Sequence, residues 1–359
     1  MCGVVGFISE NRNTNLIDNF VKDIEHRGPD SKNHLIVEVH KKYLHIGSAR
    51  LAIRGDSKEN MPMESDSKNI LAYNGEVFDM DILKKTLNNN INYPSDTRLL
   101  LDLFSYNIEN VKKVNGMFAF AFYDNSKKKL YLGRDLLGIK PLYYVIKKNG
   151  DIFFSSEISS LIKNSSGEYS LNQDSLIDIF LFNGLSSNRD FINGVKTVQP
   201  GEIISFDLNN SNNIETFKID SFNETNNEID SFEDLMEIVV QDHLNADTSV
   251  DLFLSGGIDS SILAYIIKTK LEKDVRHFSM TFSNKSFDES TTIKKISSTL
   301  GLQSKIFNFD DNLIDQYVSE SINNMGSLVL DYSFVPTYLL SKHTSQYTKA
   351  VLSGDGADE

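Results

Sequence analysis

The sequence has a single cysteine, no tryptophan and six prolines in 359 residues. One cysteine cannot form an internal disulfide, which excludes a small scaffold held together by disulfides and predicts a cytoplasmic protein. The sequence also lacks the run of about eighteen apolar residues that a membrane-spanning helix needs. Residues 1–8 carry neither the basic segment nor the long apolar stretch of a secretory signal. We therefore expect no membrane partner.

Basic residues are outnumbered by acidic ones. The 36 Lys and Arg residues against 50 Asp and Glu residues give a formal net charge of −14. A chain with this charge repels phosphate backbones, so we expect no nucleic-acid partner, although a small anion can still bind where backbone N–H groups converge. With 40% hydrophobic and 24% charged residues, the composition is typical of globular proteins. The length predicts two domains, each with its own core.

Short β-type runs dominate the first two hundred residues. Several of them follow one another with no crossover helix between them, notably within residues 117–146, which favours antiparallel pairing in a layered α+β domain. We place this domain at residues 2–208. The expected strands are residues 4–8, 43–53, 70–73, 117–123, 130–133 and 142–146.

The pattern changes after a polar segment. Residues 209–230 are rich in asparagine at both ends, which predicts an inter-domain connection with one edge strand near residues 216–219. From residue 231 onward, strands and helices alternate, which predicts a parallel sheet with ligands at the carboxyl ends of its strands. The expected strands there are residues 250–254, 277–282, 305–309 and 350–352, and the expected helices include residues 232–244, 260–270 and 290–300.

Cys2 is the first candidate nucleophile. A small second residue permits removal of Met1, and removal would leave a thiol and a free α-amine on the same residue. An α-amine has a reference pKa of about 7.7–8.0, so it can accept the thiol proton near neutral pH. The alternative is an incidental cysteine at a chain end, and Cys2 taken alone favours that alternative.

Polar residues at the ends of the β-type runs indicate a pocket for this thiol. The Asn74 amide and the Gly75 N–H could stabilise an oxyanion, and a glycine permits close approach and unusual backbone dihedral angles. Arg50 suits a bidentate contact with an α-carboxylate. Glu76 and Asp96 could hold an α-ammonium. Together, Arg50, Glu76 and Asp96 predict a pocket for the zwitterionic part of an amino acid.

The segment resembles the class II glutamine amidotransferase domain, an N-terminal-nucleophile hydrolase with an αββα sandwich. The resemblance covers most of residues 2–162. It implies that Cys2 takes the acyl group of glutamine and releases ammonia, with the pocket residues in the roles given above. One departure is Val77-Phe78-Asp79, where the family usually has a small aliphatic residue, Tyr and Asn. The fragments that carry the resemblance include His26-Arg27-Gly28-Pro29-Asp30, Tyr73-Asn74-Gly75-Glu76, Gly138-Ile139-Lys140-Pro141-Leu142-Tyr143-Tyr144 and Phe154-Ser155-Ser156-Glu157.

A second candidate site lies in residues 252–261, which run from a buried-type strand into a helix. Gly256 and Gly257 allow backbone N–H groups to turn inward, and Ser255 and Ser260 add hydroxyl donors. The following helix contributes its positive end, so the loop should bind pyrophosphate. The loop lacks the Gly-Lys-Ser/Thr ending of a Walker A motif, and a generic Ser-Gly-Gly turn is the alternative.

The Ser-Gly-Gly-x-Asp-Ser pattern resembles the loop of the ATP pyrophosphatases (PP-loop). The order of this loop and of residues 278–282, 287–290, 336–341 and 353–359 is similar to that of the glutamine-hydrolysing asparagine synthetase family. The resemblance implies an α/β parallel-sheet domain at residues 231–359, where ATP and Mg²⁺ activate the carboxylate of aspartate for amidation by ammonia. The implied residues are Ser255, Gly256, Gly257, Asp259, Ser260, Met280, Ser353 and Gly354 for ATP, Asp259 and Asp358 for Mg²⁺, and Asp355 for catalysis.

Three departures keep alternatives open. The sequence ends at Glu359, where family members usually continue, so we expect an incomplete second domain. Asp355 replaces a Glu of well-studied synthetases, and Tyr332 lies about where aspartate-using members have an Arg. The alternatives are an amidotransferase for a sugar or another carboxylate acceptor, and a chain that hydrolyses glutamine without synthesis or that binds a partner. A homodimer is also allowed.

Overall fold

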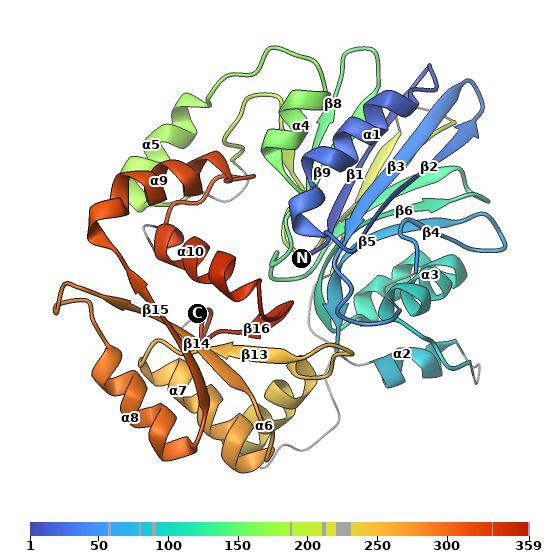
Figure 1. Cartoon of the computed structure of the whole chain (residues 1–359). Helices are drawn as coiled ribbons and strands as arrows, with labels where there is room; N and C mark the ends of the chain where they lie inside the picture. Colours follow the sequence, from blue (N-terminus) through green and yellow to red (C-terminus); the bar gives the residue numbers. More distant parts are fainter. Residues whose placement is uncertain are drawn as a thin grey trace. The chain divides into compact units, whose positions relative to one another are not determined.

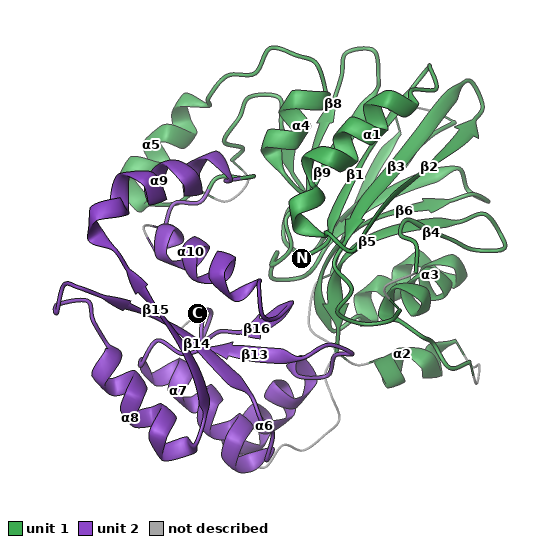
Figure 2. Ribbon diagram, in the orientation of Figure 1, with its two compact units in different colours: residues 1–224, 326–328 green, residues 225–325, 329–359 purple. Residues whose placement is uncertain are grey.

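The computed structural model describes residues 1–56, 59–78, 80–87, 91–186, 189–209, 213–219, 231–331 and 333–357. Its contacts divide the chain into two compact units (Figure 2). Unit 1 contains residues 1–224 and 326–328, and unit 2 contains residues 225–325 and 329–359. Within the described ranges, no helix combines the length and the apolar character that crossing a membrane requires.

Unit 1 stacks two six-stranded antiparallel sheets between helices (Figure 1). The first sheet has the order β10-β8-β9-β1-β3-β2 and the second has the order β12-β11-β7-β6-β5-β4. The expected αββα class is thereby confirmed. The strands are β1 (Gly3–Ser9), β2 (Ser31–Val39), β3 (Lys42–Arg50), β4 (Met63–Glu64), β5 (Ile70–Val77), β6 (Gly116–Asp124), β7 (Lys129–Arg134), β8 (Tyr143–Ile146), β9 (Ile152–Ser155), β10 (Lys196–Thr197), β11 (Glu202–Asp207) and β12 (Ile214–Lys218).

The helices of unit 1 cover the outer faces of the two sheets. Helices α1 and α4 pack on the first sheet, and α2 and α3 pack on the second. The bounds are α1 (Thr14–Asp23), α2 (Met80–Thr86), α3 (Asp96–Tyr106), α4 (Ile158–Asn164) and α5 (Gln173–Phe182).

Strand β1 is buried on both of its faces. Successive side chains of a strand point to opposite faces. Val4 and Ile8 therefore lie in the core between the sheets, whereas Val5 and Phe7 lie in the core beneath α1 and α4. This double burial explains why β1 reads as a continuous apolar run. It also fixes the position of the residue that precedes the strand, Cys2.

Part of the expected connection at residues 209–230 is a strand of unit 1. Strand β12 pairs antiparallel with β11 at the edge of the second sheet. The edge strand expected near residues 216–219 is therefore present, beginning two residues earlier at Ile214. Consequently, unit 1 continues beyond residue 208. Residues 210–212 and 220–230 of the expected connection lie outside the described residues.

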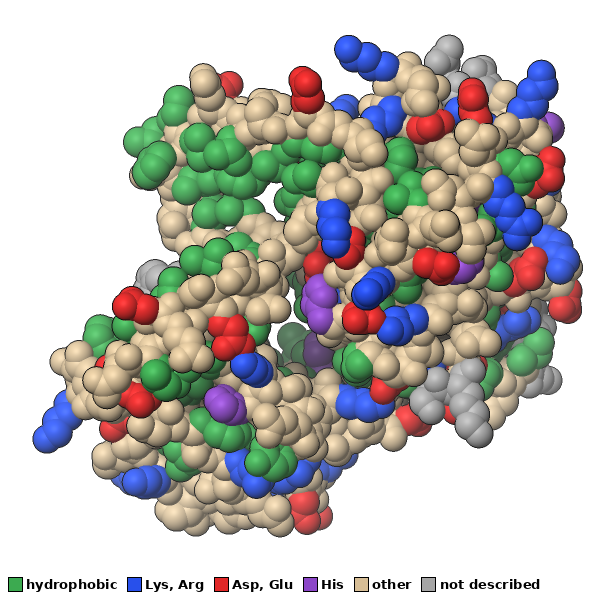
Figure 3. Space-filling model, turned by 45° about the horizontal axis from the view of Figure 1, so that its top comes forward, with side chains coloured by type: hydrophobic (Ala, Val, Ile, Leu, Met, Phe, Trp, Pro, Cys, Tyr) green, Lys and Arg blue, Asp and Glu red, His purple; other side chains and the backbone are tan. Residues whose placement is uncertain are grey.

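Helix α5 exposes an apolar face. Ile177, Phe180, Leu181 and Phe182 are all more than half exposed. Hydrophobic side chains gather over the region of this helix in Figure 3. This arrangement distinguishes α5 from α1 and α3, whose apolar side chains pack on the sheets. The helix ends at Asn183, which adopts a left-handed conformation with φ of 50°.

Unit 2 contains a four-stranded parallel sheet of order β15-β14-β13-β16. The chain passes from β13 to β14 and β15 on one side and then returns to β16 on the other. This reversal beside β13 is a topological switch point, where ligands bind in sheets of this kind. The expected parallel α/β class is confirmed. The strands are β13 (Val250–Phe253), β14 (Arg276–Phe282), β15 (Gln303–Phe309) and β16 (Ala350–Leu352).

The helices of unit 2 connect these strands. Helix α7 continues into a wider turn of π-helix at Ile266–Lys270 before the chain enters β14. Apolar residues of α6, α7 and α8 share a buried cluster with β13. The bounds are α6 (Phe232–His243), α7 (Ile258–Tyr265), α8 (Ser290–Leu300), α9 (Ile314–Asn323) and α10 (Phe334–Thr344).

Candidate active sites

The Cys2 thiol contacts the backbone that follows β3. The Leu51 N–H donates a hydrogen bond to the Cys2 sulfur at 3.4 Å. The Cys2 thiol in turn donates to the Leu51 carbonyl oxygen at 3.6 Å. Burial raises the pKa of the thiol, while the Leu51 N–H acts to lower it because it favours the thiolate. Cys2 therefore packs against a hydrophobic core while two hydrogen bonds with Leu51 hold its sulfur.

The α-amine of the chain is suited to accept a proton. Burial is the main cause that lowers the pKa of the amine on Met1 to about 6, and the nearby Arg27 charge lowers it further. An amine with this pKa is mostly neutral at pH 7. The predicted removal of Met1 would make the backbone nitrogen of Cys2 the free α-amine, on the same residue as the thiol.

Asn74 offers a buried donor that has no partner. It lies in β5 and is 1% exposed, and its Nδ2 makes no hydrogen bond within the described residues. Leaving a buried amide N–H unsatisfied costs roughly 1–3 kcal/mol, so such a group needs an explanation. A bound oxyanion would satisfy it. The orphaned Nδ2 thus fits the expected role of Asn74.

Glu76 and Asp96 carry two carboxyl groups whose charges act on each other, that of Asp96 buried and that of Glu76 partly exposed. Burial first, and then the Asp96 charge, raises the pKa of Glu76 to about 8. Burial also raises the pKa of Asp96, whose Oδ2 has no partner within the described residues. Ser95 caps α3 by accepting the Arg98 N–H, which fixes Asp96 as the first helical residue. An α-ammonium bound beside the two carboxyls would favour their charged forms.

Arg54 supports this pair and was missed by the sequence analysis. Its Nε lies 3.4 Å from Glu76 Oε2, and its Nη1 donates to the Val77 carbonyl at 2.6 Å. The Arg54 charge lowers the pKa of both carboxyls against the effect of burial. The sequence gives no signal for this role, because Arg54 lies in a loop distant in sequence from β5.

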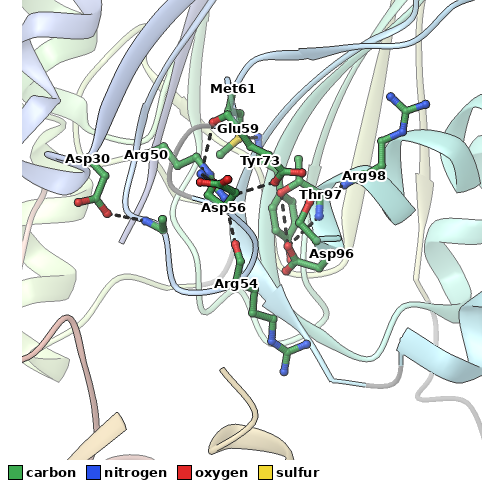
Figure 4. Close-up of polar contacts among 12 residues, drawn as sticks. Asp30, Arg50, Arg54, Asp56, Glu59, Met61, Tyr73, Asp96, Thr97 and Arg98 are labelled. Atoms are coloured by element: carbon green, nitrogen blue, oxygen red, sulfur yellow. Dashed lines mark hydrogen bonds and ion pairs between the residues drawn. The ribbon is translucent and has the colours of Figure 1, made fainter. Parts of the chain in front are cut away.

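Arg50 holds the loop that follows β3 (Figure 4). Its Nη1 donates to the carbonyls of Asp56 at 2.6 Å and Glu59 at 3.3 Å. Its Nη2 donates to the Arg54 carbonyl at 3.0 Å and lies 3.5 Å from Glu59 Oε2. The terminal N–H groups of the guanidinium thus have protein acceptors. Binding of an α-carboxylate by Arg50 stays a prediction, and it requires the loop to exchange some of these bonds.

Gly75 is explained by the close approach of β6. A Cβ at this position would lie 2.2 Å from the Met117 carbonyl oxygen and 2.7 Å from Phe118 Cα. The close approach that a glycine permits is therefore used here, whereas the freedom to adopt unusual dihedral angles is not, because Gly75 pairs with Phe118 in the regular β5–β6 ladder and its φ is not positive. Its N–H as an oxyanion donor stays a prediction.

Two of the sequence fragments anchor the start of β1. Arg27 Nε donates to the Cys2 carbonyl at 3.0 Å, and its Nη1 donates to Glu157 Oε1 at 3.0 Å. His26 Nε2 makes a hydrogen bond with the same oxygen at 2.8 Å. Although burial acts to raise it, the pKa of Glu157 lies below its usual range because of these two partners. These contacts therefore hold Cys2 in position at the start of β1.

Unit 2 has a cavity of about 280 Å³ at the carboxyl ends of β13, β14 and β16. It lies at the switch point of the sheet. The predicted ATP residues, which come from three separate segments, come together here, with Gly256 in the same loop. The predicted residues that line the cavity are Ser255, Gly257, Asp259, Ser260, Met280, Ser353, Gly354 and Asp355. Their binding of ATP stays a prediction.

The loop after β13 has an internally bonded conformation that requires glycine. Gly256 has a φ of +90°, which side chains rarely adopt. The Gly257 N–H donates to Ser255 Oγ at 3.2 Å, and Ser261 Oγ donates to the Gly257 carbonyl at 2.6 Å. No side chain caps the start of α7, so its first N–H groups can receive an anion.

Gly354 lets the loop after β16 pack against the loop after β13. A Cβ at Gly354 would lie 2.9 Å from both Asp259 Cβ and Ser260 N. Real Cβ atoms essentially never come this close, so a larger residue would force the two loops apart. The cavity therefore depends on Gly354.

The cavity also fits a divalent cation that arrives with a nucleotide. The described residues contain no group of three or more His, Cys, Asp and Glu side chains placed to hold a metal ion. Mg²⁺ is usually held by one or two carboxylates together with substrate phosphates. Asp259 in the cavity lining fits that pattern. The other predicted ligand, Asp358, lies outside the described residues.

An αββα sandwich with a thiol at its amino end, followed in the chain by a phosphate-type loop on a parallel sheet, defines the class of glutamine amidotransferases. Comparisons with known families agree with this class. The model of the glutamine amidotransferase domain matches residues 1–217, and the model of asparagine synthase matches residues 231–359. The chain belongs to the family that the glutamine amidotransferase model describes.

Three relatives illustrate the similarity. Asparagine synthetase [glutamine-hydrolyzing] 1 of Bacillus subtilis is 27% identical over 100% of this chain and 58% of its own length. Putative asparagine synthetase 2 of Methanocaldococcus jannaschii is 29% identical over 100% of this chain and 75% of its own length. Amidase chyE of Penicillium rubens is 24% identical over 100% of this chain and 58% of its own length. The chain thus spans little more than half of two of these proteins.

Replacing Asn74 by Ala separates a catalytic role from a structural one. We expect Asn74→Ala to lower kcat for glutamine hydrolysis by about 10²–10³-fold, the usual effect of removing one oxyanion donor. The variant should keep its thermal stability, because the lost donor has no partner in the structure. The measurements are initial rates of glutamate release and Tm.

Asn69→Ala is the matched control. Asn69 is also buried, but its Nδ2 donates to Ser105 Oγ at 2.9 Å and its Oδ1 accepts the Asn125 N–H at 2.9 Å. This control should lower Tm and leave kcat near the wild-type value. A large Tm loss with unchanged kcat in Asn74→Ala would rule out the oxyanion role.

The raised pKa of Glu76 predicts proton release when glutamine binds. With a pKa of about 8, Glu76 is mostly protonated at pH 7 in the free protein. A bound α-ammonium lowers that pKa, so binding at pH 7 should release close to one proton, and the release should disappear above about pH 9. Calorimetry of Cys2→Ala in buffers of different ionisation enthalpy measures this number. Equal proton release from Cys2→Ala and from Cys2→Ala with Glu76→Gln would contradict the assignment.

Proposed function

We propose that this chain carries the glutaminase and ATP-binding parts of a glutamine-dependent asparagine synthetase. In this proposal, glutamine hydrolysis at Cys2 releases ammonia, which amidates an adenylated aspartate. The products are asparagine, glutamate, AMP and pyrophosphate. The observation that carries the proposal is the buried Asn74 amide, which has no partner within the described residues, in the strand that also carries Glu76, whose charge acts on the Cys2 thiol.

The residues of unit 1 support a stepwise hydrolysis. The α-amine of Cys2 takes the thiol proton, and the thiolate attacks the carboxamide carbon of glutamine. The Asn74 amide and the Gly75 N–H stabilise the oxyanion that forms. The proton on the amine passes to the leaving nitrogen, which departs as ammonia. Water then hydrolyses the thioester, so that glutamate leaves and the thiol is restored.

The residues of unit 2 support nucleotide binding. The N–H groups at the start of α7 and the hydroxyls of Ser255 and Ser260 would contact the phosphates of ATP, and Asp259 would contact Mg²⁺. ATP would supply the adenylyl group that activates the acceptor carboxylate. Asp355 lines the same cavity and would be the catalytic residue.

A different acceptor is the second candidate, and the cavity lining favours it. The described residues that line the cavity include Asp259, Glu289 and Asp355 but no Lys, Arg or His. Aspartate brings a second carboxylate, which proteins usually bind with a cation. A sugar acid or another carboxylate without an additional negative charge needs no such partner. Tyr332, the residue expected near the acceptor, lies outside the described residues.

The remaining expectations stay predictions. Small molecules are the proposed substrates, and a net charge of −14 makes nucleic acid an unfavourable partner. A homodimer and a cytoplasmic location are the other two features of the proposal. A chain that only hydrolyses glutamine is its most limited form.

Paired variants test whether the two activities have separate sites. We expect Cys2→Ala to abolish glutamine hydrolysis, by at least about 10³-fold, because the nucleophile is lost. It should leave ammonia-driven AMP formation unchanged. Gly354→Ala should do the reverse, because its Cβ disrupts the cavity of unit 2. Glutamate and AMP release by the wild-type chain and both variants are the measurements.

The same assay identifies the acceptor. The proposal predicts AMP release with aspartate and formation of asparagine. AMP release with a sugar acid and none with aspartate would establish the second candidate and overturn the first. Equal loss of both activities in Cys2→Ala would contradict separate sites.

A further inference from the structure

Lys140 is presented by a tightly bonded turn between β7 and β8. The carboxylate of Asp135 accepts four backbone N–H groups at 2.9–3.1 Å. Arg134 Nε donates to the Lys140 carbonyl at 2.8 Å, and its other nitrogens donate to the carbonyls of Gly138 and Val198. These seven hydrogen bonds hold the backbone of the turn, Lys140 included, in one conformation. The four N–H groups belong to Phe118, Leu137, Ile139 and Lys140.

The side chain of Lys140 is buried without a carboxylate partner. Lys140 is 8% exposed, and its ammonium donates a hydrogen bond to the Met1 sulfur at 3.5 Å. A thioether is a weak acceptor for an ammonium group that has three donors. Within the described residues, its Nζ makes no ion pair, whereas buried charges in proteins are normally paired. Removal of Met1 would leave the ammonium without this contact.

Charged groups from several elements act on the amine and thiol. Arg27 and Lys140 lower the pKa of the α-amine, while Glu76 raises it. Arg50 lowers the pKa of the Cys2 thiol, and Glu76 again opposes it. Lys140 itself is affected mainly by burial, which lowers its pKa, and then by Glu76. The cations at this site therefore belong to the turn Glu25–Arg27, to β3 and to the turn that carries Lys140.

We propose that Lys140 is a positioning residue of the glutaminase site, whose ammonium, once Met1 is removed, favours the neutral amine and the anionic thiolate of Cys2. The inference rests on the proposed glutaminase function. A nearby positive charge disfavours protonation of an amine and favours ionisation of a thiol. The reaction begins from those two forms. Lys140 thus acts through Cys2 and requires no contact with glutamine.

The pH dependence of two reactions tests the proposal. Lys140→Met keeps an unbranched side chain of similar length and removes its charge. We expect the acid limb of kcat/KM for glutamine hydrolysis to shift upward by about one pH unit, which is an approximately tenfold loss at pH 6 and little loss above about pH 9. The pH midpoint of Cys2 alkylation by iodoacetamide should shift in the same direction. Lys140→Arg should keep both wild-type midpoints.

Lys129→Met is the matched control. Lys129 lies in β7 and pairs with Glu215 at 2.7 Å on the surface, so its removal should leave both midpoints unchanged. If Lys140→Met lowers the rate equally at every pH, with unchanged midpoints, Lys140 has a structural role and the proposal is overturned. The midpoint is measured on folded protein, which circular dichroism verifies at each pH.

Alkylation keeps this inference separate from the proposed function, because it requires no glutamine. A shifted alkylation midpoint in a wild-type chain that fails to hydrolyse glutamine would support Lys140 and contradict the proposed function. If the wild type hydrolyses glutamine and Lys140→Met shows no midpoint shift, the proposed function is supported and the role of Lys140 is contradicted.

Discussion

Burial of the first residues of the chain is the constraint on which the candidate glutaminase site depends. Strand β1 has side chains in two cores at once, and Val4 exchanges hydrogen bonds with Ser156 at 2.9 and 2.8 Å. Burial also lowers the pKa of the amine on Met1 to about 6, although Met1 as a whole is 55% exposed. An exposed terminus would keep a pKa near 8 and would be mostly protonated at neutral pH. The sandwich thus makes a proton acceptor from the end of a chain.

The polar residues around this terminus divide into two groups. Arg27, Arg50 and Asp135 have several protein partners each, and they hold the segments that carry the site. Asn74 and Lys140 are buried with few or weak partners. Buried polar groups are normally satisfied, so the second group indicates where a ligand or a reacting residue is expected. The cavity of unit 2 depends on close packing as well, because Gly354 allows the two loops that line it to stay in contact.

Much of the fold could be predicted from the sequence, and the reasons for the misses are physical. Strands β13 and β16 have apolar runs bounded by turn residues, and their observed bounds differ from the expected ones by one residue or none. Strand β2 was missed because it is an edge strand with mostly half-buried side chains and a weak apolar pattern. In the site, Cys2 could be predicted from its position. The loop contacts of Arg50 could not, because they depend on a conformation that the local sequence does not specify.

The central claim is that the thiol of Cys2 reacts beside its own amine. Mass spectrometry of the mature protein, after treatment with an electrophilic glutamine analogue, tests it most directly. The account predicts a polypeptide that begins at Cys2 and carries one label, on the sulfur of that residue. A retained Met1, or a label on any other residue, would contradict it.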